Sequence, residues 1–172
     1  LEIKEDEILI LIDNGIHKIV NLRTLSSAKT KTILTKKNYN PGTLLMNEFM
    51  VSGTEWIEIY NPHSIAFYMD GLYMVNSADT VIFEYDSIAG GGYVVLSKDT
   101  SEVRSEYYQL NLKLHQCELF ALPDREDTFS FFLNDILLDS VIRGYENSSV
   151  SVERISSEIS GYKKENWDDC ID

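Results

Sequence analysis

The sequence predicts an all-β fold, an antiparallel sandwich or barrel, and three observations predict it. Short runs rich in Val, Ile, Phe and Tyr recur from residue 44 onward, turn residues separate them, and no long amphipathic helical pattern interrupts them. Strands are expected at 44–51, 55–60, 65–69, 72–76, 80–85, 93–97, 107–112, 117–122, 128–133, 136–142 and 150–155. Turn-forming pairs such as Asn61-Pro62, Asp70-Gly71 and Asn134-Asp135 mark the places where the chain reverses.

The segment 55–60 shows the two-residue strand period directly. Ile57 and Ile59 fall on one face, while Trp56, Glu58 and Tyr60 fall on the other. One face of this strand therefore belongs to a core. By the same reasoning the expected core residues are Ile57, Ile59, Leu72, Met74, Val94 and Leu96.

The chain is expected to divide at the breaker sequence 38–42, Asn-Tyr-Asn-Pro-Gly. Residues 1–40 predict an N-terminal β-hairpin arm, or the end of a preceding domain, because apolar runs flank the turn former Asn14-Gly15. Residues 41–172 predict the sandwich, and its last segment, 156–172, is expected to be an edge strand or a tail. Because the chain begins at Leu1 rather than Met, we expect it to be a segment of a longer protein, with any targeting signal outside it.

Charge and composition exclude several classes of function. The 172 residues include 15 Lys and Arg against 28 Asp and Glu, a net charge of −13. Residues 1–40 carry a net charge of +2, so the expected sandwich, 41–172, carries −15. Such a domain is a poor partner for nucleic acid or for an anionic membrane surface. No apolar run exceeds five residues, so a membrane attachment would need an anchor outside this segment.

The residues that could carry catalysis or metal binding form no recognised motif. No GxSxG sequence is present, Cys117 and Cys170 lie in no CxxC pair, and Gly90-Gly91-Gly92 precedes a strand rather than a helix. We therefore assign no catalytic residue, cofactor or metal site. The two cysteines are either paired or free thiols, and both possibilities stay open.

Glu48 and Glu58 are the one carboxylate pair that needs two interpretations. Both lie inside expected strands, where a charge is costly unless it is paired. They are either an acid/base or metal-binding pair, or they are exposed or accept hydrogen bonds and an ion pair from a basic residue such as Arg154. We favour the second interpretation.

Seven short segments beyond residue 44 occur in an order that resembles the lamin-tail domain family. Its most specific part is Trp56-Ile57-Glu58-Ile59-Tyr60-Asn61-Pro62, which is similar to the family's W-[IV]-E-[LI]-x-N-P strand and turn. Two departures are Asp70-Gly71-Leu72 in place of Ser-Gly-Trp, and Gly90 in place of a proline. The residues that carry the resemblance are Asn47, Glu48, Trp56, Glu58, Asn61, Pro62, Gly71, Gly92, Tyr93, Asp139, Glu153 and Arg154, followed by Asn166-Trp167.

The resemblance implies an immunoglobulin-like β-sandwich without catalytic residues. Its closest pattern is that of lamin-tail segments of bacterial surface lipoproteins, so we expect an extracellular, cell-surface or periplasmic module, lipid-anchored through the rest of the protein. It would bind a protein or a glycan. The family's DNA-binding role in nuclear lamins is disfavoured here by the charge of −15.

Within the resemblance, Trp56, Glu58 and Arg154 are expected to form a packed polar cluster, so that Glu58→Ala would leave an arginine unpaired. One alternative is a carbohydrate-binding accessory module beside a hydrolase, which exposed coplanar aromatics such as Trp56, Tyr68 and Tyr73 on one face would favour. The other is a carboxylate-dependent hydrolase with Glu48 and Glu58 in a cleft.

Overall fold

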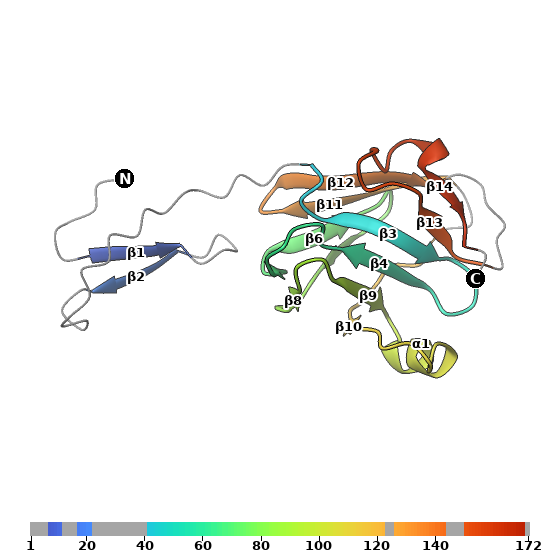
Figure 1. Ribbon diagram of the computed structural model, residues 1–172, viewed down its shortest axis with the longest axis horizontal. Coiled ribbons are helices and arrows are strands. Elements are labelled where there is room, and N and C mark those ends of the chain that lie inside the picture. Colours follow the sequence, from blue (N-terminus) through green and yellow to red (C-terminus); the bar gives the residue numbers. More distant parts are fainter. Residues whose placement is uncertain (1–6, 12–16, 22–40, 123–125, 144–149, 171–172) are drawn as a thin grey trace. The chain divides into compact units, whose positions relative to one another are not determined.

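The computed structural model of the chain describes residues 7–11, 17–21, 41–122, 126–143 and 150–170 (Figure 1). The chain forms two compact units, Leu1–Asn38 and Tyr39–Asp172. In the first unit, β1 (Glu7–Leu11) pairs antiparallel with β2 (His17–Asn21). The expected hairpin strands are thus present, while the turn former Asn14-Gly15 lies outside the described residues.

A six-stranded sheet forms one layer of the second unit (Figure 1). Its spatial order is β10 (Leu114–Gln116), β9 (Tyr93–Ser97), β4 (Trp56–Tyr60), β3 (Leu45–Met50), β13 (Val152–Arg154) and β14 (Trp167–Asp169). All neighbours are antiparallel except β9 and β10. The strand β14 closes one edge of this sheet, so the final segment does contain the expected edge strand.

A four-stranded antiparallel sheet forms the second layer. Its order is β12 (Ile136–Arg143), β11 (Asp127–Leu133), β6 (Leu72–Val75) and β7 (Thr80–Ile82). Asn134 and Asp135, with φ of 47° and 66°, join β11 to β12 in the left-handed conformation that a tight hairpin needs. Two further short strands, β5 (Phe67–Tyr68) and β8 (Ser87–Ile88), pair only with each other.

The core lies between these two sheets and contains inward-facing side chains from both. Along β11 every second residue is buried, which is the two-residue period of a strand with one solvent face. The six expected core residues are each no more than 1% exposed. The fold is therefore an all-β sandwich, as the sequence predicts.

The sequence prediction is wrong at 107–112 and 117–122, which are not strands. The helix α1 (Thr100–Glu106) precedes the first of these, and the Asp99 carboxylate caps it by accepting the N–H groups of Ser101 and Glu102. Residues 117–122 bury Leu119, Phe120 and Leu122 in the core without pairing as a strand. Apolar content alone therefore gave a false strand signal there. Within the described ranges, no helix has the length and apolar character needed to cross a bilayer.

Candidate functional site

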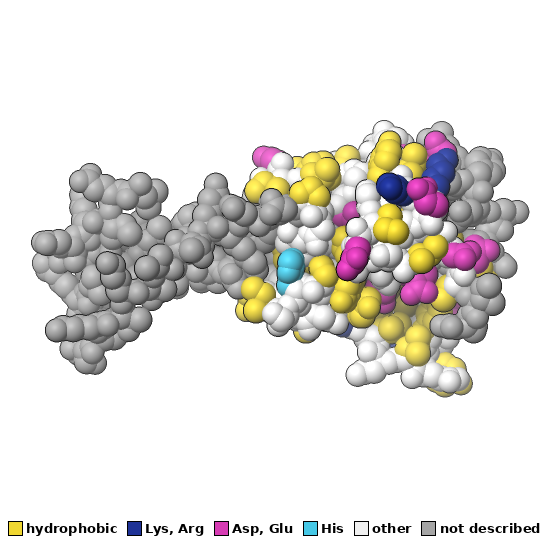
Figure 2. All heavy atoms as spheres, turned by 45° about the horizontal axis from the view of Figure 1, so that its top comes forward, with side chains coloured by type: hydrophobic (Ala, Val, Ile, Leu, Met, Phe, Trp, Pro, Cys, Tyr) yellow, Lys and Arg dark blue, Asp and Glu magenta, His cyan; other side chains and the backbone are white. Residues whose placement is uncertain are grey.

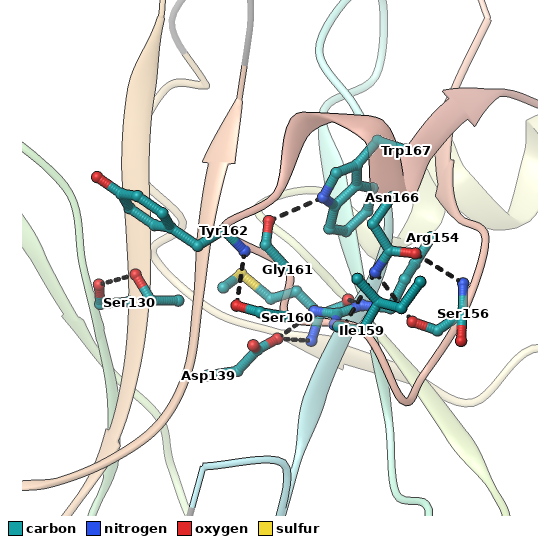
Figure 3. Close-up of polar contacts among 12 residues, drawn as sticks. Ser130, Asp139, Arg154, Ser156, Ile159, Ser160, Gly161, Tyr162, Asn166 and Trp167 are labelled. Carbon is teal, nitrogen blue, oxygen red and sulfur yellow. Dashed lines mark hydrogen bonds and ion pairs between the residues drawn. The ribbon is translucent and has the colours of Figure 1, made fainter.

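An ion pair between Arg154 and Asp139 lies in the interior of the sandwich and joins the two sheets (Figure 3). The Arg154 side chain, on β13, is 1% exposed, and the Asp139 side chain, on β12, is 7% exposed. Arg154 Nη2 donates to Asp139 Oδ2, and Arg154 Nε donates to the Met46 carbonyl at 2.7 Å. Asp139 Oδ2 also accepts the Met46 N–H at 3.0 Å, so both charges are bonded to β3 as well.

The loop before β14 completes the surroundings of Arg154. Its guanidinium donates from Nη1 to the Ile159 carbonyl at 3.1 Å and lies 5.1 Å from the centre of the Trp167 ring. Trp167 Nε1 donates to the Gly161 carbonyl at 2.9 Å. A Cβ on Gly161 would lie 2.4 Å from Arg154 Nη2, so only glycine lets the loop approach this closely.

Desolvation governs the electrostatics of this pair. Burial lowers the pKa of Arg154, and the attraction of Asp139 acts in the opposite direction. Burial likewise raises the pKa of Asp139, against the attraction of Arg154. The charges are therefore well bonded but expensive to bury, which makes the loss of either partner costly.

The expected cluster of Trp56, Glu58 and Arg154 does not form, and Arg154 pairs with neither Glu48 nor Glu58. Successive residues of a strand point to opposite faces. Arg154 points into the sandwich, whereas Glu58 lies on the outer face of the six-stranded sheet. Glu58→Ala consequently leaves no arginine unpaired.

Four acidic residues lie in register across that outer face, and we call them the carboxylate row. Asp168 on β14 is opposite Glu153 on β13, Glu153 is opposite Glu48 on β3, and Glu48 is opposite Glu58 on β4. Directly opposite residues of antiparallel strands lie on one face, so like charges repel along this row. On the face that Figure 2 shows, acidic side chains lie at several places, whereas most of the visible basic ones gather near one edge.

These surroundings raise the pKa of Glu58. Burial raises the pKa of Glu58 from 4.5 to about 7, and Glu48 and Glu153 add to the rise. The amide of Asn47, which donates to Glu58 Oε1 at 2.9 Å, acts against it. Ser151 Oγ donates to Glu48. A carboxyl with a raised pKa beside other carboxyl groups is electrostatically suited to acid/base chemistry, and it is equally the result of crowding like charges.

The aromatic side chains that would favour a carbohydrate-binding module if they shared one face lie in three different places. Trp56 is only 6% exposed and packs edge-on against Tyr107 at 5.8 Å, beneath α1. Tyr68 is on β5 and Tyr73 on β6. Trp56, Tyr68 and Tyr73 therefore form no coplanar platform that would favour a carbohydrate-binding module. Tyr60 and Tyr93 instead stack at 4.6 Å on the six-stranded sheet, and Tyr93 is 46% exposed.

A second surface, which the sequence did not single out, lies on the outer face of the four-stranded sheet. Ile82, Tyr73, Phe132 and Leu137 are cross-strand neighbours on β7, β6, β11 and β12, and we call them the apolar row. The rings of Tyr73 and Phe132 stack at 5.2 Å with 13° between their planes. The alternation of Thr128, Ser130 and Phe132 between buried residues was a signal for this face, but only the pairing register shows that the four side chains align.

The remaining motif residues shape turns. Asn61 is fully buried, and its amide donates to the carbonyls of Ile65, Ile88 and Ala89 at 2.8, 3.1 and 3.1 Å. Pro62 follows it in the same turn. Gly71 has φ of +76°, and a Cβ there would lie 2.7 Å from Asn134 Oδ1. Gly92 precedes β9, so the glycine run is a turn before a strand, as expected.

Cys117 and Cys170 are not joined in a disulfide. Burial raises the pKa of Cys117 to about 11, which leaves little reactive thiolate at neutral pH. Within the described part of the chain, no three or more His, Cys, Asp or Glu side chains are grouped so that they could hold a metal ion.

The fold and these surfaces define an all-β sandwich with a buried ion pair and two chemically different outer faces. No protein-family model, curated protein or solved structure matches the chain.

Proposed function

We propose that this chain is a non-catalytic interaction module of a larger bacterial surface or secreted protein, and that its ligand is a protein. The observation that carries the proposal is the apolar row. Ile82 is 75% exposed and Leu137 37% exposed, yet both project from paired strands of a rigid sheet. Apolar side chains gathered on such a face favour contact with another macromolecule.

The proposal extends to family and location. The resemblance of residues 56–62 and 151–154 to lamin-tail domains supports an immunoglobulin-like sandwich of the bacterial surface type. A pair of β-sheets packed over one core is compatible with that type. The protein would lie outside the cytoplasm and be held at the membrane by a lipid anchor elsewhere in its sequence.

A glycan ligand is the second candidate, and the stacked Tyr60 and Tyr93 favour it. They lie on strands β4 and β9, next to Glu58, and carboxylates beside an exposed aromatic ring can bind sugar hydroxyls while the ring packs on the sugar. This candidate corresponds to an accessory module beside a hydrolase. The stacking covers one face of each ring, however, so less flat surface is offered than a sugar platform needs.

Two screens of the full chain separate these candidates. The immobilised chain is exposed to a random-peptide phage library and, in parallel, to a glycan array. We expect enrichment of related peptide sequences and no reproducible glycan signal. Glycan binding without peptide enrichment would overturn the protein-binding proposal in favour of the accessory module.

A further inference from the structure

The outer face of the four-stranded sheet bears no charged side chain among its described residues. Its outward positions follow from the cross-strand pairs of β7, β6, β11 and β12. They are Thr80, Ile82, Tyr73, Val75, Thr128, Ser130, Phe132, Leu137, Ser140 and Ile142. In a unit whose residues 41–172 carry a net charge of −15, an uncharged face of this extent is a marked local exception.

Hydrogen bonds and stacking hold the side chains of this face in place. The Tyr73 hydroxyl donates to Asp135 Oδ1 at 2.9 Å, and its ring stacks on Phe132. The Ser130 and Ser140 hydroxyls bond to each other at 3.0 Å. A partner that binds here meets side chains that are already ordered, which lowers the entropic cost of association.

Carboxylates lie at both ends of this uncharged face. Asp79 lies just before β7, Glu84 lies just beyond it, and Asp135 lies in the β11–β12 turn, and all three are exposed. None of them forms an ion pair with a described Lys, Arg or His. The result is an apolar centre with an acidic rim.

We propose that this face docks a protein partner whose contact surface is apolar at its centre and carries Lys or Arg at its rim. The inference rests on the proposed protein-binding function and names the site and the chemistry of the partner. Charge complementarity supports it, because basic groups at the rim would meet Asp79, Glu84 and Asp135 while apolar side chains cover the apolar row. A second copy of this chain fits worse, since it would bring the same acidic rim against this one.

Three synthetic peptides test the proposal against the full chain by fluorescence anisotropy. The first has a Val-Thr-Val-Thr-Val centre with Lys-Lys at each end. The second has the same centre between Glu-Glu ends, and the third has a Ser-Thr-Ser-Thr-Ser centre between Lys-Lys ends. We expect the first peptide to bind at least about tenfold more tightly than either of the others, because it alone matches both centre and rim.

Substitutions on the apolar row test whether the first peptide binds to this face. Ile82→Ser and Leu137→Ser each remove an exposed side chain of the apolar row and should weaken binding of the first peptide about tenfold. Ile155→Ser is the matched control, because Ile155 is 62% exposed and follows β13 of the other sheet. Circular dichroism checks that all three variants remain folded.

The inference would be overturned by equal binding of the two Lys-ended peptides, or by full affinity in both row variants. Binding of the Glu-ended peptide as tightly as the first would overturn the role of the rim. These outcomes can be told apart from failure of the proposed protein-binding function itself. If the phage library yields peptides whose binding ignores Ile82→Ser and Leu137→Ser, the chain is a protein-binding module that uses another face.

Discussion

Asp139→Ala should destabilise the sandwich strongly, because it leaves the Arg154 charge buried without its partner. The substitution removes the acceptor of both Arg154 Nη2 and the Met46 N–H. Breaking a buried ion pair from one side costs about 3–5 kcal/mol. For a unit of this size each kcal/mol shifts the midpoint of thermal unfolding by about 3–5 °C, so the expected fall is about 10–25 °C.

The double variant Asp139→Ala/Arg154→Met sharpens this prediction. It removes the uncompensated charge, although the carbonyls of Met46 and Ile159 lose their donor. We expect it to recover about 1–2 kcal/mol relative to Asp139→Ala alone, since the desolvation penalty of the guanidinium disappears. Urea unfolding followed by circular dichroism measures all variants. A loss below about 1 kcal/mol in Asp139→Ala, or a double variant that is clearly less stable than the single one, would refute the reasoning.

Three further predictions concern single side chains. Protonated Glu58 stabilises the fold fully below pH 4.5, and this contribution is lost as the pH rises through about 7. The free energy of unfolding of the wild type, measured by urea titration, should fall over this window by less than about 3 kcal/mol after solvent screening. Parallel pH profiles for wild type and Glu58→Gln would contradict this. Gly161→Ala should lower stability by about 1–3 kcal/mol because its Cβ would contact Arg154 Nη2 at 2.4 Å, and an unchanged thermal midpoint would argue against that contact. Cys117, with a pKa of about 11, should react with a thiol reagent at pH 7.5 much more slowly than a free cysteine, which a Cys117→Ser comparison measures.

Local patterns in the sequence were enough for much of the fold. Segment 55–60 alternates in the strand period, so its inward Ile57 and Ile59 could be identified without a structure. Turn formers such as Asp70-Gly71 and Asn134-Asp135 fall where the chain reverses, because their backbone angles suit few other residues. The pattern failed at 107–112 and 117–122, where apolar residues pack against the sheets without joining them as strands.

The candidate surfaces depend on pairing between distant segments, which no local pattern reveals. The register places Glu48 opposite both Glu58 and Glu153, so the carboxylate row requires strands far apart in the sequence. The prediction that Arg154 pairs with Glu58 was wrong for the same reason. Glu58 and Asp139 are both acidic strand residues, and only the packing of β12 against β3 brings Asp139 to the guanidinium.

The most direct test of the docking face is an NMR map of where the Lys-ended Val-Thr peptide binds on the full chain. The account predicts amide shifts concentrated on β6, β7, β11 and β12, around Tyr73 and Phe132. Shifts confined to β3, β4 and β13, around Glu48 and Glu58, would show that the peptide follows charge alone, and they would contradict the account.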